Sequence, residues 1–237
     1  MQNHVPLMVL SHITTNTSKS FLEYNGFMVA DLQTIPLFPL GQTLFPGGAI
    51  DLKIFEVRYL DMIKECVANH TSFGIVTLDQ GSEVRTPGQE DIIFMPIGTI
   101  AEITYFDAPQ PTLFYIKCKG GQRFKVHHSQ RQKNGLWIGD VQYLPNDPEF
   151  NIEAEHQKLA DDVGKIIASL QKKGVREDQM PFARPYLLDQ CGWVANRWCE
   201  ILPLTPAQKH HLLGIENPHI RLDLIKELIE EMTGQSQ

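Results

Sequence analysis

Between Thr34 and Leu144, apolar and polar residues alternate mostly with a period of two, which is typical of β-strands. One stretch, residues 56–70, breaks the alternation: Val57, Leu60 and Ile63 recur at helical spacing and predict an amphipathic helix. The expected strands are IPLFPL, AIDLKIF, FGIVTL, PIGTIAEITYF, TLFYIKCK, QRFKVHH and LWIGDVQYL. Because a sheet with so few helices must close on itself to hide its edges, the pattern predicts a curled sheet or barrel.

Two consecutive glycines, Gly120 and Gly121, separate the expected strands 112–119 and 122–128. A glycine pair between two alternating segments is typical of a two-residue hairpin turn of type I′ or II′. The sequence therefore predicts a tight β-hairpin centred on these glycines.

After Leu144 the apolar period changes to 3.6 residues, which predicts helices. Residues 159–170 carry an apolar stripe, and 172–174 (Lys-Lys-Gly) suit a helix end. A second stripe covers 194–202. Residues 205–208 (Thr-Pro-Ala-Gln) fit a capping box with proline at the first helical position, and Asn217-Pro218 begins a final helix in the same way. These elements predict a small helical bundle.

The chain divides into three expected parts, and the expected fold class is α+β. Residues 1–33 are rich in Ser, Thr and Asn, so we expect a poorly ordered leader, with Met28 as an alternative start. Residues 34–146 form the expected β-barrel. The proline-rich connector PNDPEF then leads into the expected helical bundle of residues 147–237.

Composition is that of an ordinary folded protein. Of the 237 residues, 42% are apolar and 21% are charged, far from the profile of a disordered chain. The formal net charge of −7 argues against a dedicated nucleic-acid binder, which needs a basic face. Four cysteines in a chain of this length do not indicate a disulfide framework, and neither an apolar run of about 18 residues nor a signal peptide is present. We therefore expect a reduced, cytoplasmic protein without a membrane segment.

Sequence signatures of catalysis and metal binding are absent. The chain has no G-x-x-x-x-G-K-[ST] phosphate loop, no G-x-S-x-G elbow and no H-E-x-x-H helix. Cys191 and Cys199 would lie about 12 Å apart along a helix, too far to share a zinc ion with Zn–S bonds of about 2.3 Å. We therefore expect no enzyme, no cofactor and no metal. A catalytic use of Glu56 or Glu83 in a barrel cleft is a weaker alternative.

Several separated motifs occur in order between Thr34 and Leu144. They are IPLFPL (35–40), LFPG (44–47), IFEVRY (54–59), FGIV (73–76), GSEV (81–84), IGTIA (97–101) and RFKV (123–126). Together they resemble the N-terminal domain of Lon-type ATP-dependent proteases. The segments WVANRW, LPLTPAQKHHLLG and NPHIRLDLI resemble its helical part more loosely, and Val57 stands where the family usually has proline.

The resemblance implies a PUA-like curled β-barrel (pseudobarrel) followed by a helical bundle. It also implies a stand-alone substrate-recognition module that binds polypeptide clients, or a protease or chaperone partner, without ATPase or peptidase parts. At the corner between strand and helix, we expect Glu56 and Arg58 to form hydrogen bonds or an ion pair. Tyr59 and Phe55 are expected to fill the space beneath.

Aromatic residues between positions 182 and 202 are the candidate polypeptide-binding residues. They are Phe182, Tyr186, Trp193 and Trp198. A surface that recognises unfolded chains needs exposed apolar area ringed by polar groups. On a helix, Trp193 lies about 100° away from Val194, off the main apolar stripe. Trp193 therefore either seals the junction between barrel and bundle or is exposed as a binding anchor.

An alternative function is RNA binding by the expected hairpin, because residues 117–133 hold six basic residues and no acidic one. PUA-like barrels include RNA binders, which supports this alternative by fold analogy. The candidate residues are Lys117, Lys119, Arg123, Lys125, Arg131 and Lys133. The negative overall charge and the few aromatic residues available for base stacking argue against it.

Overall fold

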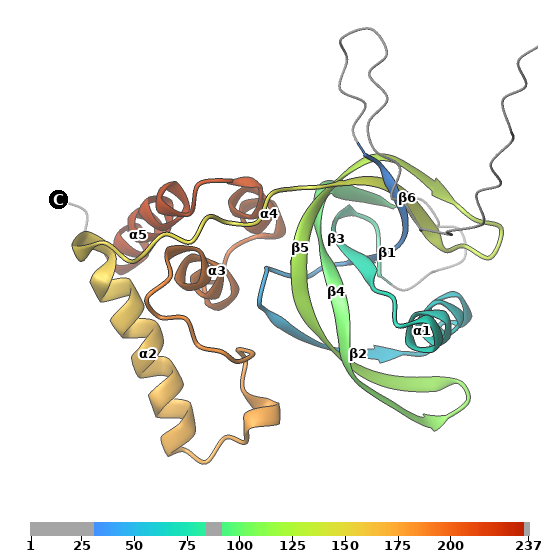
Figure 1. Cartoon of the computed structure of the whole chain (residues 1–237), viewed down its shortest axis with the longest axis horizontal. Helices are drawn as coiled ribbons and strands as arrows, with labels where there is room; N and C mark the ends of the chain where they lie inside the picture. The colour runs from blue at the N-terminus through green and yellow to red at the C-terminus, as the bar shows by residue number, and fades with distance from the viewer. Residues whose placement is uncertain (1–30, 84–91, 235–237) are drawn as a thin grey trace, which may run out of the picture. The chain divides into compact units, whose positions relative to one another are not determined.

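The computed structural model describes residues 31–83 and 92–234 (Figure 1). Most of the expected leader, including Met28, and Val84 of the GSEV motif lie outside the described residues. Within them, a sheet with one helix comes first and four further α-helices follow. The fold class is α+β, as the change of period predicted.

The first part of the described chain is a six-stranded sheet with one α-helix. Its elements are β1 (Gln33–Leu40), β2 (Ala49–Ile54), α1 (Val57–Asn69), β3 (Phe73–Gln80), β4 (Ile93–Gln110), β5 (Leu113–Arg131) and β6 (Trp137–Tyr143). The strands pair in the order β2-β5-β4-β3-β1-β6, and β6 also pairs with β5. The sheet therefore closes on β5, which has three neighbours, and is a curled pseudobarrel instead of a strict barrel.

Strand β5 is continuous over 19 residues, and Gly120 and Gly121 lie in its middle. The predicted hairpin at these glycines is therefore wrong. The loop between β1 and β2 crosses the strand here: the Gly47 amide donates to the Gly120 carbonyl (2.7 Å), and the Gly120 amide donates to the Gly48 carbonyl (2.8 Å). A Cβ atom on Gly120 would lie 2.1 Å from the carbonyl oxygen of Phe45. Glycine is needed here for close approach of two backbones, not for a turn.

Helix α1 completes the apolar core inside the curled sheet. Leu60 and Ile63 are buried, as the helical spacing predicted, whereas Val57 is 73% exposed. The ring of Tyr59 stacks on Phe38 of β1, with 3.9 Å between the ring centroids. The inward face of α1 is therefore rotated slightly from the one predicted, and it seals the sheet with an aromatic contact.

The described residues after β6 form a helical part with a central helix, α3. The α-helices are α2 (Gln157–Lys172), α3 (Cys191–Ile201), α4 (Pro206–Gly214) and α5 (Pro218–Thr233). Thr205 and Gln208 form the predicted capping box at the start of α4. Every residue from Cys191 to Arg197 is buried, because α3 contacts α2, α4 and α5. This burial on all sides explains why α3 is rich in apolar and small residues.

The sheet and the helical part belong to one compact unit, residues 32–237. Phe45, from the loop between β1 and β2, is completely buried in the apolar core of the helical part. A residue of the sheet part therefore contributes to the core on the other side of the expected boundary at 146/147.

Candidate functional site

The loop of residues 44–48, between β1 and β2, is the place where the sheet meets helix α3. Arg197 of α3 is fully buried and donates hydrogen bonds to the carbonyls of Gly47 (2.6 Å) and Pro46 (2.9 Å). Gly47 has a φ of 71°, in the left-handed region that favours glycine. The LFPG motif therefore forms a loop whose carbonyls are held by one buried arginine.

Glu200 extends this contact one turn further along α3. Its Oε1 accepts a hydrogen bond from Nη2 of Arg197 at 3.0 Å, and its Oε2 is buried without a hydrogen-bond partner among the described residues. Burial raises the pKa of Glu200 to about 7, although the charges of Arg197 and Lys209 act in the opposite direction. A Cβ atom on Gly48 would lie 2.0 Å from Oε1 of Glu200, so this carboxylate also depends on a glycine.

A second buried cluster of charges joins β5, the connector after β6 and α5. Asp147 accepts hydrogen bonds from Arg123 (3.1 Å) and from both terminal nitrogens of Arg221 (2.7 and 3.0 Å). The same guanidinium groups donate to carbonyls near the end of α4, those of Leu213 (2.8 Å) and Leu212 (3.1 Å). Burial lowers the pKa of Arg123. The cluster links the sheet to the helical part by hydrogen bonds and ion pairs.

Sequence reasoning missed Arg197, Glu200 and Asp147 and treated Arg123 as a surface cation. Arg197 did carry a signal, because it stands inside the largely apolar segment WVANRW, where a charge indicates a buried partner. Asp147 gave no comparable signal, since an aspartate in a polar connector is ordinary. Its importance comes from two arginines that lie 24 and 74 residues away in the chain.

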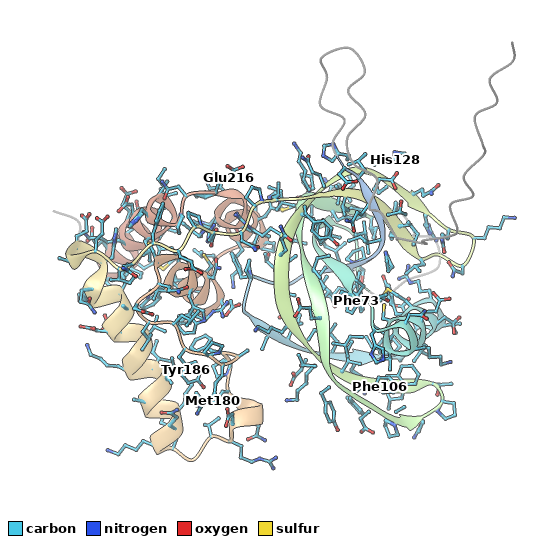
Figure 2. The ribbon with its side chains drawn as sticks, in the orientation of Figure 1. Phe73, Phe106, His128, Met180, Tyr186 and Glu216 are labelled. Carbon is cyan, nitrogen blue, oxygen red and sulfur yellow. The ribbon has the colours of Figure 1, made fainter. Side chains whose placement is uncertain are left out.

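Two grooves, which we call the junction grooves, run along this contact on either side of Phe182. The larger has a volume of about 620 Å³ and lies between strands β2, β4 and β5 and the segment 177–184. The smaller, about 390 Å³, lies between residues 41–50 and helices α3 and α4. Ala49, Pro181 and Phe182 line both grooves. Figure 2 shows Met180, which also lines the larger groove, on the segment that follows α2.

Both junction grooves are lined by apolar and by charged residues. In the larger groove, Met180 and Phe182 are buried, and Lys117 and Lys119 of β5 are partly exposed. In the smaller groove, the apolar residues include Ile201, which is 37% exposed. This arrangement suits an elongated partner with apolar side chains and a polar backbone.

The candidate aromatic residues lie close together but mostly inside the protein. Phe182 and Trp193 are 3% and 8% exposed and meet edge to face, with 6.3 Å between their centroids. Tyr186 lies 6.2 Å from Trp193 by the same measure, and the indole nitrogen of Trp198 donates to the carbonyl of Leu159 at 3.1 Å. The structure thus places Trp193 within the junction. Of the four, Phe182 lines the junction grooves.

The six basic candidate residues do not form a basic face on a two-stranded hairpin, which the RNA-binding alternative requires. Arg123 is 2% exposed within the Asp147 cluster, and Lys117 pairs with Asp51 at 3.2 Å. The others spread along β5 and the turn after it: Lys119, Lys125, Arg131 and Lys133. Because β5 runs straight through the glycines, the expected hairpin face does not exist.

At the corner between β2 and α1, Glu56 and Arg58 form an ion pair of 2.9 Å. The guanidinium carbon of Arg58 lies 4.5 Å from the ring centroid of Tyr59, so charge and aromatic ring stack. Phe55 is 50% exposed, and the prediction that it fills the space beneath is wrong. Side chains alternate along a strand, and Ile54, which is 1% exposed, takes the inward position instead.

Glu56 and Glu83 both line a cavity of about 220 Å³ beside β2. Each carboxylate already has a partner: Glu56 pairs with Arg58, and Glu83 accepts a hydrogen bond from the Gly41 amide at 2.6 Å. These contacts hold the corner and the loop after β1 in place. Both carboxylates thus take part in contacts that stabilise the fold.

The described residues contain no cluster of metal ligands, no disulfide and no membrane-spanning helix. No three His, Cys, Asp or Glu side chains among these residues are arranged to hold a metal ion. The four cysteines are buried and unpaired, and burial raises the pKa of Cys118 and of Cys199 to about 12. No helix within residues 31–83 and 92–234 is long and apolar enough to cross a membrane.

Comparison with proteins of known sequence finds Lon proteases and protein cereblon among the relatives. The chain is 25% identical over 206 residues to Lon protease of Anaeromyxobacter dehalogenans, covering 82% of this chain and 23% of that protein. It is 28% identical over 133 residues to protein cereblon of Danio rerio, covering 52% of this chain and 29% of that protein. The chain therefore spans less than a third of the length of these curated relatives.

The structure is also similar to a solved one, the Lon N-terminal domain protein from Xanthomonas campestris. That similarity has a TM-score of 0.64 and 30% identity, and it covers 82% of this chain and 98% of the other. The family described as the ATP-dependent protease La (LON) substrate-binding domain matches residues 34–231. This range includes the loop of residues 44–48, Arg197, the Asp147 cluster and the junction grooves. The chain belongs to the family of Lon substrate-binding domains.

Proposed function

We propose that this chain is a non-catalytic module that binds polypeptide segments in the junction grooves. Membership of the Lon substrate-binding family supports binding of substrates as the general role. The observation that carries the specific proposal is the pair of grooves on either side of Phe182, each lined by both apolar and charged residues. Arg197, Asp147 and Arg221 are engaged with each other or with main-chain carbonyls, which suits charged groups that hold a binding surface in place.

The size of the grooves suits a short extended segment. The volume of the larger groove, about 620 Å³, lies within the range of roughly 300–1,000 Å³ that is typical of ligand sites. Apolar side chains of an unfolded client would contact Met180 and Phe182, and its backbone would stay near the charged residues. The partners are then unfolded client proteins, or a protease or chaperone that receives them. Four unpaired cysteines suit a reducing compartment such as the cytoplasm.

The exposed residue Ala49 allows a direct test, because it lines both junction grooves without being part of the core. Ala49→Trp should fill the grooves and raise the Kd for a fluorescent, reduced and carboxymethylated protein about tenfold, or about 1.4 kcal/mol. Anisotropy titration of the full chain measures this. The matched control is Ala168→Trp, on an exposed position of α2, which should change the Kd less than about twofold.

Two results would contradict the proposal. Equal Kd values for Ala49→Trp and wild type would separate client binding from the junction grooves. Hydrolysis of ATP or cleavage of casein by the stringently purified chain would show that the module is catalytic.

A further inference from the structure

Helix α5 carries a row of apolar side chains that the core covers only in part. Ile220, Leu224, Leu228 and Met232 follow one another at intervals of four residues. Ile220 is 52% exposed and Met232 is 49% exposed, and the two leucines between them are half-buried. Positions four apart form a continuous ridge on a helix, and such ridges interlock in the commonest class of helix packing. The outer face of α5 therefore has the form of a helix-packing surface.

A groove of about 390 Å³ lies between helix α4 and this face of α5, and it is distinct from the junction grooves. Its apolar base consists of Ala207 and Leu212 from α4 and Leu224 and Leu228 from α5. The leucines on α5 span one turn, and the lining continues to Glu231, so the groove follows α5 for about two turns, or roughly 10 Å. A groove between two helices with an apolar base fits a third helix.

The edge of this groove on α5 is acidic. Glu227 and Glu231 are exposed and lie four residues apart, each directly before a residue of the apolar ridge. Glu227 and Glu231 line the groove, and His211 stands on the α4 side. Like charges on two copies of α5 would face each other in a symmetric pair and repel. The acidic row thus favours a partner with positive charge.

We propose that the groove between α4 and α5 binds an amphipathic helix of another protein, with apolar residues at i, i+3 or i+4 and i+7 and with Lys or Arg beside them. The apolar side chains would enter between Leu212, Leu224 and Leu228, and the cations would pair with Glu227 and Glu231. The proposal goes beyond client binding, since it uses another surface and a helical partner.

The test uses the full chain and a fluorescent peptide of about 18 residues, five helical turns, with Leu on one face and Lys on the other. We expect this peptide to bind, and a peptide with Glu in place of Lys to bind at least about tenfold more weakly. Leu228→Glu and the double variant Glu227→Lys/Glu231→Lys should each raise the Kd about tenfold. Circular dichroism confirms that the variants are folded.

A matched double reversal on α1, Asp61→Lys/Glu65→Lys, changes two exposed acids four residues apart outside the groove and should alter the Kd less than about twofold. Ala49→Trp should leave peptide binding unchanged, so failure here and failure of client binding are distinguishable. Equal binding of the Leu/Glu peptide, or no effect of the α5 variants, overturns the proposal. So does a dimer that Leu228→Glu abolishes in sedimentation, since it would identify a second copy as the occupant.

Discussion

Glu200 shows how a single residue can link the junction to pH. Its carboxylate lies between Arg197 and the Gly48 backbone, and its side chain is 19% exposed. One oxygen is paired with Arg197, and the other is buried without a hydrogen bond in the described residues. Burial therefore outweighs the attraction of the neighbouring cations and raises the pKa of Glu200 to about 7 from 4.5. The folded state holds the proton more tightly than the unfolded state.

The first stability prediction follows from this difference in pKa. The stabilisation from the Glu200 proton is fully present below about pH 4.5 and is lost as the pH rises through about 7. Gln resembles the neutral acid and does not titrate. Between pH 5 and pH 8 the free energy of unfolding of the wild type should therefore fall by about 2–3 kcal/mol relative to that of Glu200→Gln. Urea unfolding at both pH values measures the change. Parallel profiles for the two proteins would refute it.

At the scale of elements, strand β5 contains two adjacent glycines with different structural requirements. Its glycine pair lies where the loop of residues 44–48 crosses the strand, so the two glycines meet different neighbours. A Cβ atom on Gly120 would lie 2.1 Å from a backbone oxygen of Phe45, which cannot move without displacing the loop. A Cβ atom on Gly121 would lie 2.9 Å from Oε1 of Glu102, the end of a flexible side chain.

The adjacent glycines therefore form a matched pair for mutation. Gly120→Ala should lower the free energy of unfolding by about 1–3 kcal/mol, the usual cost of overpacking, and should displace the loop of residues 44–48. Gly121→Ala should cost less than about 1 kcal/mol, because the Glu102 side chain can rotate away. Chemical denaturation compares the two variants. Equal losses would mean that the crossing of loop and strand does not restrict position 120.

At the scale of the whole molecule, Asp147 joins the sheet to the helical part. Its side chain is 14% exposed and accepts hydrogen bonds from Arg123 of β5 and Arg221 of α5. Removing one member of such a cluster leaves buried charges without compensation. The sheet and the helical part, proposed here as residues 34–146 and 147–237, should therefore depend on each other for stability.

Asp147→Ala tests this dependence. The loss of the shared carboxylate should lower the free energy of unfolding by about 3–5 kcal/mol, since two buried arginines lose their anionic partner. Thermal or urea unfolding measures the loss, and Asp189→Ala, at an exposed aspartate of the segment before α3, should change stability by less than about 0.5 kcal/mol. A small effect of Asp147→Ala would mean that the two parts do not depend on this cluster for their stability.

The sequence by itself determined the family, the helices and most of the strands, although it divided β5 into two strands. Strand and helix periods, the capping box of Thr205 and Gln208, and the ordered motifs all depend on residues a few positions apart, so their physical cause can be read along the chain. The gathering of Phe182, Tyr186 and Trp193 was predicted for the same reason, because they lie within 12 residues.

Only the tertiary structure decided what depends on distant residues. Gly120 and Gly121 lie within a strand because a loop some 73 residues away crosses it at Gly47, and the local turn preference yields to that contact. Arg123 is buried because Asp147 and carbonyls about 90 residues away compensate its charge. Periodicity reports only which face of an element is apolar. The partner of that face, and whether a charged residue is buried, depend on segments brought together by folding.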